Sequence, residues 1–290
     1  RSFIPLLSSF ACAIPGIMAA RSISNWRDRL TTIMIAPLMT CSARLPVYAL
    51  LIAAFIPQRT VLGVFNLQGV VLFGLYVLGI VSAMAVAWVA KRLGGHSVRS
   101  MLVMELPPYR WPHARDVLLG LYERALIFLK RVGTVILTLT ILLWFLSTYP
   151  GAPAGATEPA ITYSYAGMLG RLLEHVFAPI GFNWQISIAL VPGMAAREVA
   201  VSAMSTVYAL SGGEEAADAL GAIIGAQWSL ATGLSLLVWY VFAPMCVSTL
   251  ATVRRETNSI RYAWLMAGYM FALAYAACWV TYRVALALGA

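Results

Sequence analysis

Charged residues are scarce in this sequence. Asp, Glu, Lys and Arg make up only 11% of its 290 residues, and hydrophobic residues make up 61%. A soluble domain has about 25% charged and about 45–50% apolar residues. So little charge cannot cover the surface of a water-soluble globule of this size. Several apolar runs reach the roughly 20 residues that cross a bilayer as a helix. The composition therefore predicts an all-α polytopic membrane protein in contact with lipid.

Motifs of enzymes and of nucleic-acid-binding proteins are also missing. No GxxxxGK(S/T) phosphate loop occurs, so the chain does not hydrolyse a nucleotide by that route. The three histidines form no HExxH pair, and the four cysteines include no CxxC pair, which gives no disulfide framework. The net charge of +9 is not clustered as nucleic-acid binding requires, and it is typical of loops that set membrane orientation. We expect no nucleic-acid partner and no bound cofactor.

Seven apolar segments can be drawn along the chain. Two further stretches, 114–131 and 166–181, are amphipathic and are expected to lie at the membrane surface. Because the chain starts at Arg1 beside an apolar run, we expect it to belong to, or to pair with, something larger. The seven segments are residues 3–20, 31–56, 61–90, 132–149, 184–209, 228–253 and 262–288.

The charge distribution favours a re-entrant hairpin at 184–209. If all seven segments crossed, the acidic loop 210–227 would share a side with the basic stretch 91–131, against the positive-inside rule. A hairpin that enters and leaves on one face removes the conflict. Pro192-Gly193 supplies a hinge, and Arg197 and Glu198 are costly when they face lipid. A kinked crossing helix is the alternative.

Two pairs of short strings recur in the same order. PGIMAAR at 15–21 resembles PGMAAR at 192–197, and APLMTCS at 36–42 resembles APMCVS at 243–248. If both PG strings lie in hairpins, the two copies have opposite orientations, which in secondary transporters places the substrate site at the repeat interface. We therefore predict an inverted repeat of a hairpin plus a broken helix. The predicted parts are the first repeat in 1–90, connecting helices in 91–149, a loop and interfacial helix in 150–183, and the second repeat in 184–290.

The repeated strings contain the candidate chemistry. A proline inside a helix frees a backbone carbonyl, and cysteines follow Pro37 and Pro244 closely. Sulfur and oxygen ligands at one depth suit a divalent metal such as Fe²⁺. A buried cysteine or methionine can equally be a packing residue, which is our reading of Cys278. The candidate ligands are Cys12, Cys41, Cys246, Met39, Met245, Thr40, Ser42 and Ser248.

Other polar and conformational residues are expected to hold the segments in place. Arg44 lies inside an apolar run and must be paired or face water. Glu198 is its possible partner, and Arg197 alternatively extends to the membrane surface. The residues expected to shape or gate the site are Pro15, Gly16, Pro37, Arg44, Pro192, Gly193, Arg197, Glu198 and Pro244.

Three strings resemble one transporter family closely. SSFACAIPGIMAAR (8–21), RDRLTTIMIAPLMTCSARLPVYALLIAAFIP (27–57) and VPGMAAREVAVSAMSTVYAL (191–210) are similar to the membrane region of the bacterial ferrous iron transport protein B (FeoB) family, with its two gate repeats. The resemblance implies Fe²⁺ uptake across the bacterial inner membrane, with Cys12, Cys41 and Cys246 on the iron path. It also implies a GTP-binding domain outside this chain, small accessory proteins and a possible homo-oligomer. The chain itself is then not an enzyme.

The sequence therefore predicts a permease core in which Fe²⁺ passes between two broken helices. Two alternatives stay open. The hairpins also resemble those of concentrative nucleoside transporters, which suggests a carrier for nucleosides or similar small solutes. The second alternative is a gate-type membrane scaffold that transports nothing.

Overall fold

The computed structural model describes residues 2–61, 65–93, 111, 113–151, 163–195, 197, 199–207 and 213–289. This part of the chain is helical apart from one short antiparallel pair, β1 (Thr60–Val61) and β2 (Phe65–Asn66). The predicted all-α class is therefore confirmed.

The first third of the chain forms short helices followed by one long helix. The elements are α1 (Phe3–Ser9), α2 (Ala13–Ala19), the 3₁₀ turn η1 (Ala20–Ser22), α3 (Trp26–Ile35), η2 (Ala36–Leu38), η3 (Ser42–Arg44), α4 (Leu45–Phe55) and α5 (Leu67–Leu93).

The remainder begins with a very long helix and ends with another. The elements are α6 (Ala114–Thr148), α7 (Tyr165–Phe177), η5 (Ala178–Ile180), α8 (Trp184–Ala195), α9 (Val199–Val207), α10 (Gly213–Gln227), α11 (Leu230–Phe242), α12 (Val247–Thr257) and α13 (Ile260–Ala287).

Three stretches of the described chain are long and apolar enough to cross a membrane: Trp26–Phe55, Leu67–Arg92 and Ile260–Ala287. A fourth is possible if Tyr165–Ile180 and Trp184–Met194, which meet at a bend of 99°, form one span. The predicted total of about seven membrane segments stays a prediction.

Capping side chains and prolines explain where the helices next to the site begin and end. The Asn25 side chain accepts from the Arg27 amide at 3.0 Å at the start of α3. Ser229 does the same for α11, accepting from the Thr232 amide at 3.2 Å. Such oxygens satisfy amides that have no partner within the helix. Helices α3 and α11 each end two residues before a proline, Pro37 and Pro244, as expected because proline disfavours helical geometry in the residue before it.

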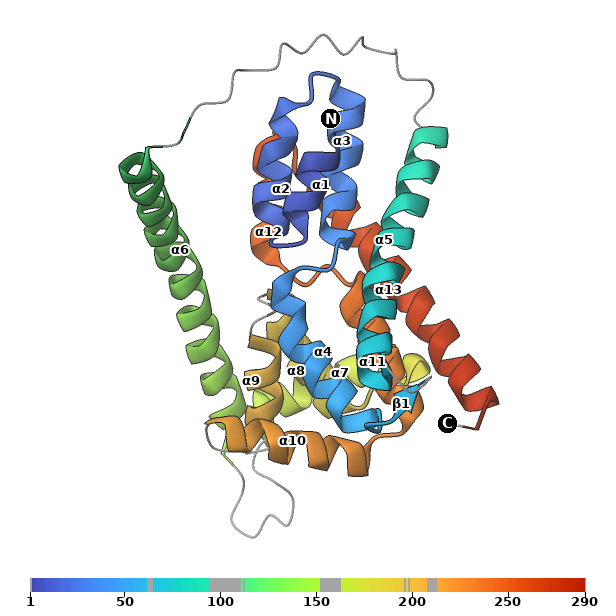
Figure 1. Ribbon diagram of the computed structural model, residues 1–290. Coiled ribbons are helices and arrows are strands. Elements are labelled where there is room, and N and C mark those ends of the chain that lie inside the picture. The colour runs from blue at the N-terminus through green and yellow to red at the C-terminus, as the bar shows by residue number, and fades with distance from the viewer. Residues whose placement is uncertain are drawn as a thin grey trace.

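Figure 1 shows how these helices are arranged. Helices α1, α2, α3 and α12 lie in the upper half, and α4, α7, α8, α9 and α11 lie in the lower half, with α10 across the bottom. Helices α5 and α13 flank this bundle on the same side. Helix α6 stands to the other side and contacts α7, α8 and α9. The two broken stretches, α3 to α4 and α11 to α12, thus meet near the middle of the molecule.

An aromatic cluster anchors the lower half. The Trp239 ring of α11 lies edge-on to Phe177, Phe182 and Phe271, with centroids 5.4, 5.8 and 5.4 Å away. T-shaped contacts of this kind place the positive ring edge against the negative ring face. The cluster fixes α11 against α7 and α13, and so fixes the helix that leads into the second interruption.

Two predicted boundaries were wrong. The stretches 114–131 and 132–149, expected to be an interfacial helix and a separate crossing segment, form the single helix α6. A change from charged to apolar composition does not end a helix, and no proline lies within α6. The acidic stretch 210–227, expected to be a loop, contains α10, whose several alanines favour a helix.

The expected hinge at Pro192 is displaced. Pro192 lies inside α8, which continues to Ala195, and the link to α9 spans 196–198. Proline removes only one hydrogen bond when it stands close to a helix end. In the first copy Pro15 and Gly16 lie inside α2, after the turn at 10–12 that joins it to α1. The two PG strings therefore occupy different places relative to the nearest turns.

Replacing Gly16 with alanine is expected to loosen the α1–α2 pair. An added Cβ would lie 2.0 Å from Ser9 Oγ and 2.7 Å from the Pro5 carbonyl oxygen. Ser9 Oγ already donates to that carbonyl at 2.8 Å, so the two helices must separate. Overpacking of this kind costs about 1–3 kcal/mol, measurable as a lower melting temperature in detergent by circular dichroism. Gly74→Ala is the control, because nothing lies within 4 Å of its Cβ position. Equal melting of the two variants would contradict the prediction.

Candidate functional site

The site lies where the two apolar stretches are interrupted. In the first interruption, which we call break 1 (residues 39–41), Met39 and Cys41 have extended backbone between η2 and η3. In the second, break 2 (residues 243–246), Ala243 and Cys246 are extended between α11 and α12. Because extended residues cannot continue the helical hydrogen bonds, carbonyl groups at both breaks need other partners. Irregular backbone at this depth is tolerated only when it is buried in protein or lines a watery cavity.

Arg44 provides those partners at break 1. Its side chain is completely buried, and its Nη2 donates to the Pro37 carbonyl at 3.1 Å. Its Nη1 lies 3.5 Å from the carbonyl oxygens of Leu38 and Met39. A cation at the carbonyl end of a helix is favoured by the helix dipole. Arg44 therefore binds the end of the helical segment that the break interrupts, and the predicted partner Glu198 lies outside the described residues.

Arg197 contacts both breaks at once. It lies in the link between α8 and α9, is 7% exposed, and donates from Nε to the Met245 carbonyl at 2.9 Å. Its Nη1 lies 3.3 Å from Cys41 Sγ. Arg197 is therefore buried rather than extended to the membrane surface. A single guanidinium joins the thiol of break 1 to the backbone of break 2.

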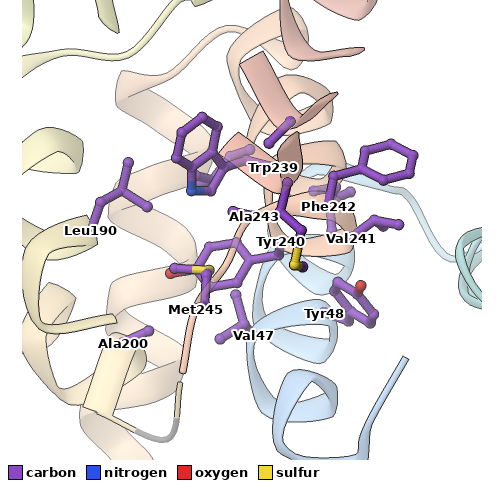
Figure 2. Close-up of a cluster of buried hydrophobic side chains, with 14 of the residues drawn as sticks. Val47, Tyr48, Leu190, Ala200, Trp239, Tyr240, Val241, Phe242, Ala243 and Met245 are labelled. Atoms are coloured by element: carbon purple, nitrogen blue, oxygen red, sulfur yellow. The ribbon is translucent and has the colours of Figure 1, made fainter. Parts of the chain in front are cut away.

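Further polar atoms are buried around this contact. Thr40 Oγ1 and the hydroxyls of Tyr48 and Tyr240 are buried and, among the described residues, have no hydrogen-bond partner. Figure 2 shows Tyr240 next to Met245, with Tyr48 approaching from α4. Most buried polar atoms in proteins are hydrogen-bonded, so these three oxygens are available to interact with a polar or charged group.

Two glycines let neighbouring helices approach the breaks closely. A Cβ on Gly79 of α5 would lie 2.9 Å from Thr40 Oγ1, and one on Gly193 of α8 would lie 3.2 Å from Met245 Cε and 3.5 Å from the Tyr240 hydroxyl. A Cβ at Gly79 would require Thr40 to shift, and one at Gly193 would press on the Met245 side chain. Gly193 is buried and packs closely against break 2, and its role in shaping the site stays a prediction.

The structure brings part of the predicted ligand set together. Met39, Thr40 and Cys41 share break 1, and Arg197 links Cys41 to the backbone carbonyl of Met245 rather than to its predicted thioether. Ser42 is exposed and donates to the Ala11 carbonyl at 3.0 Å, which ties break 1 to the turn between α1 and α2. No group of three or more His, Cys, Asp or Glu residues that could hold a metal occurs in the described part of the chain. A metal here would therefore need carbonyl, hydroxyl or thioether ligands as well.

The three candidate cysteines occupy the same kind of position. Cys12, Cys41 and Cys246 are the residues that directly precede α2, η3 and α12. Cys12, Cys246 and Ser248 are half-buried, whereas Cys278 is fully buried and faces the Ser235 carbonyl at 3.2 Å. The placement of Cys278 agrees with its reading as a packing residue. Pro37 and Pro244 are buried at the breaks, and Pro15 is exposed on α2.

An ion pair between an exposed arginine and a buried carboxylate was not predicted from the sequence. Glu256 of α12 accepts from Arg21 Nε and Nη2 at 2.6 and 2.5 Å, and Arg29 Nη2 donates to its backbone carbonyl at 3.2 Å. The hydrogen bond to Glu256 raises the pKa of Arg21 above its usual value. The pair joins η1 and α3 to the end of the second broken stretch. The only feature of the sequence that points to this ion pair is the position of Arg21 at the end of the repeated string PGIMAAR.

Two family models match the chain. The Gate model, described as nucleoside recognition, matches residues 1–55 and 129–260, which is more than half of the chain. The chain belongs to the Gate family. A second model, described as the C terminus of ferrous iron transport protein B, matches residues 72–124. The matched regions include both breaks and the helices that lead into them.

The relatives of this Gate protein confirm the FeoB resemblance. It is 41% identical over 98% of its length to the Fe(2+) transporter FeoB of Leptospira interrogans. It is 37% identical to that of Staphylococcus aureus over 98% of its length, and 32% identical to that of Helicobacter pylori over 95%. It covers only 43%, 40% and 47% of these relatives, so it spans less than half of their length. No solved structure matches it. The chain is thus the FeoB-type membrane region of a multi-pass protein of the bacterial inner membrane.

Proposed function

We propose that this chain is the permease core of a ferrous iron transporter and that Fe²⁺ passes between the two broken stretches. The observation that carries the proposal is the double contact of Arg197, which brings Cys41 Sγ and the Met245 carbonyl within reach of one guanidinium. Sulfur and oxygen ligands together suit a borderline cation such as Fe²⁺. The relatives named above are Fe(2+) transporters.

The proposed ligation is weak and sequential. Cys12, Cys41 and Cys246 act as transient sulfur ligands, because a closed site of high affinity would trap the ion. Arg44, Arg197 and Glu198 hold the segments that present these ligands. The remaining proposed ligands are Met39, Met245, Thr40, Ser42 and Ser248.

We also propose that the two halves form an inverted repeat. The strings at 36–42 and 243–248 both span the end of one helical segment and the start of the next. Helix α5 contacts α3 and α4, and α13 contacts α11 and α12 in the same way. In Figure 1 the first broken stretch runs from the upper half to the lower half and the second runs the opposite way. Such a relation places a substrate site at the repeat interface.

The remainder of the transport cycle is assigned outside this chain. The FeoB resemblance supports a GTP-binding domain in sequence that this chain does not include, with hydrolysis located there and not in the permease core. Small accessory proteins and a homo-oligomer are proposed on the same basis. Fe²⁺ is the transported substrate rather than a resident cofactor.

Uptake by membrane vesicles tests the proposal. Vesicles that contain the complete transporter should accumulate radioactive Fe²⁺ kept reduced with ascorbate, and unlabelled Fe²⁺ should compete while uridine should not. A nucleoside carrier is the second candidate because the matching family model is described as nucleoside recognition. Competition by uridine, or uptake of labelled uridine, would favour that candidate. Absence of any uptake by correctly inserted protein would favour a scaffold role.

A further inference from the structure

The guanidinium of Arg197 donates hydrogen bonds to two of the atoms that would bind Fe²⁺. Cys41 Sγ of break 1 and the Met245 carbonyl oxygen of break 2 both carry lone pairs, and Arg197 donates to both, at 3.3 and 2.9 Å. A guanidinium has five N–H donors and no acceptor. Lone pairs that accept from it are not available to a metal ion, whose bonds to sulfur and oxygen are about 2.0–2.3 Å long.

Electrostatic repulsion prevents Fe²⁺ and the Arg197 guanidinium from binding these ligands at the same time. Arg197 is 7% exposed and the neighbouring Arg44 is fully buried, so water screens neither cation well. A divalent ion placed between Cys41 and Met245 would meet the Arg197 charge at contact distance. Ion and guanidinium therefore cannot share these ligands, and one must leave before the other binds.

We propose that Arg197 is a tethered cation that holds the place of Fe²⁺ in this conformation and withdraws when the ion binds. This inference rests on the proposed iron path through Cys41 and Met245. Iron entry is then an exchange of one cation for another, which keeps the thiol and the carbonyl satisfied in both states. Ions that bind these ligands too weakly to displace the guanidinium are excluded, so Arg197 is a positioning residue that sets selectivity.

The surroundings of Arg197 allow such a movement. It lies between two helices rather than within one, in the link from α8 to α9. Pro192 lies inside the last part of α8, where it removes a backbone hydrogen bond and favours a bend. Arg44 ends the 3₁₀ turn η3 directly before α4. It donates to carbonyls five to seven residues away in its own segment, whereas Arg197 donates to Cys41 itself.

Protection of Cys41 from alkylation tests the exchange. The complete transporter in vesicles is treated with N-ethylmaleimide over a range of Fe²⁺ concentrations, and the Cys41 peptide is quantified by mass spectrometry. Each rate is normalised to the rate without metal. The Fe²⁺ concentration that gives half-protection should fall at least about tenfold in Arg197→Gln, which corresponds to about 1.4 kcal/mol. Arg197→Lys retains the cation and should stay close to the wild-type midpoint.

The outcomes separate this inference from the proposed function. If wild type and Arg197→Gln need the same Fe²⁺ concentration for half-protection of Cys41, the tethered cation is overturned but the iron path is left intact. Complete lack of protection in wild type at every Fe²⁺ concentration would overturn the path itself, and the inference with it. A lower midpoint in Arg197→Gln but not in Arg197→Lys supports exchange.

A second measurement uses the unmodified protein and so does not depend on whether a variant folds. Phenylglyoxal modifies arginine side chains, and its reaction with Arg197 and with Arg44 can be followed on separate peptides. Fe²⁺ should accelerate modification of Arg197 severalfold and leave Arg44 unchanged, because only Arg197 gives up its partners. Identical Arg197 rates with and without Fe²⁺ would overturn the proposal.

Discussion

Replacing Cys41 with serine should reduce ferrous iron uptake at least about tenfold, since even indirect supports of a metal site contribute about 10–100-fold. Serine is close to cysteine in size and can accept from Arg197 as the thiol does at 3.3 Å. The fold and the Arg197 contact should therefore survive while the soft sulfur ligand is lost. Radioactive Fe²⁺ uptake in a bacterial strain without its own ferrous transporter, normalised to the amount of protein in the membrane, measures the effect.

Cys278→Ala is the matched control for this variant. It also removes one buried sulfur, but Cys278 lies on α13 against the Ser235 carbonyl of α11, away from both breaks. Its uptake should stay close to wild type. Normal uptake by a correctly inserted Cys41→Ser, Cys246→Ser double variant would remove sulfur ligation from the mechanism.

The interruptions themselves were predictable because proline acts locally. Ala36-Pro37 and Ala243-Pro244 cannot continue a helix, and α3 and α11 end at Ile35 and Phe242. The burial of the candidate residues of break 1 followed from the same apolar strings. Signals that act over two or three residues can thus be interpreted without knowing the tertiary structure.

The partners of the arginines were not predictable in the same way. Arg197 and Cys41 are 156 residues apart, and nothing in either local string indicates that they meet. From the sequence, we expected Arg197 either to hold its segment in place or to extend to the membrane surface. In the structure it bridges the two breaks. Arg44 was expected to be paired or to face water, with Glu198 as a possible partner, and backbone carbonyls pair with it. A proline-broken helix exposes such carbonyls, which is the signal that could have indicated this role.

Composition was a poor guide to helix boundaries. The positive charges near residue 130 suggested that a membrane segment begins there, but α6 passes through them without a break. Charge determines where a helix lies relative to the membrane, whereas proline, glycine and capping residues determine where it ends. The displaced turn after Pro192 has the same origin, because one proline near a helix end is tolerated.

Replacing Arg44 with methionine should give the largest loss of stability. Two effects oppose each other: methionine removes the desolvation penalty of a fully buried cation, but it leaves three carbonyls at the end of the α3 segment without a donor. Each unsatisfied buried acceptor costs about 1–3 kcal/mol. We expect a net loss of about 3 kcal/mol, or about 10 °C in melting temperature.

Thermal unfolding of the detergent-purified transporter, followed by circular dichroism, measures this loss. Arg44→Lys should be intermediate, since a compact ammonium retains the charge but cannot span three carbonyls as a planar fork does. Arg254→Met removes an exposed arginine from α12 and should melt like wild type. If Arg44→Met melted at the same temperature as Arg254→Met, the carbonyls of break 1 would not depend on Arg44. Because those carbonyls lie two to four residues before Cys41, a stable but rearranged break would then appear as altered Cys41 alkylation.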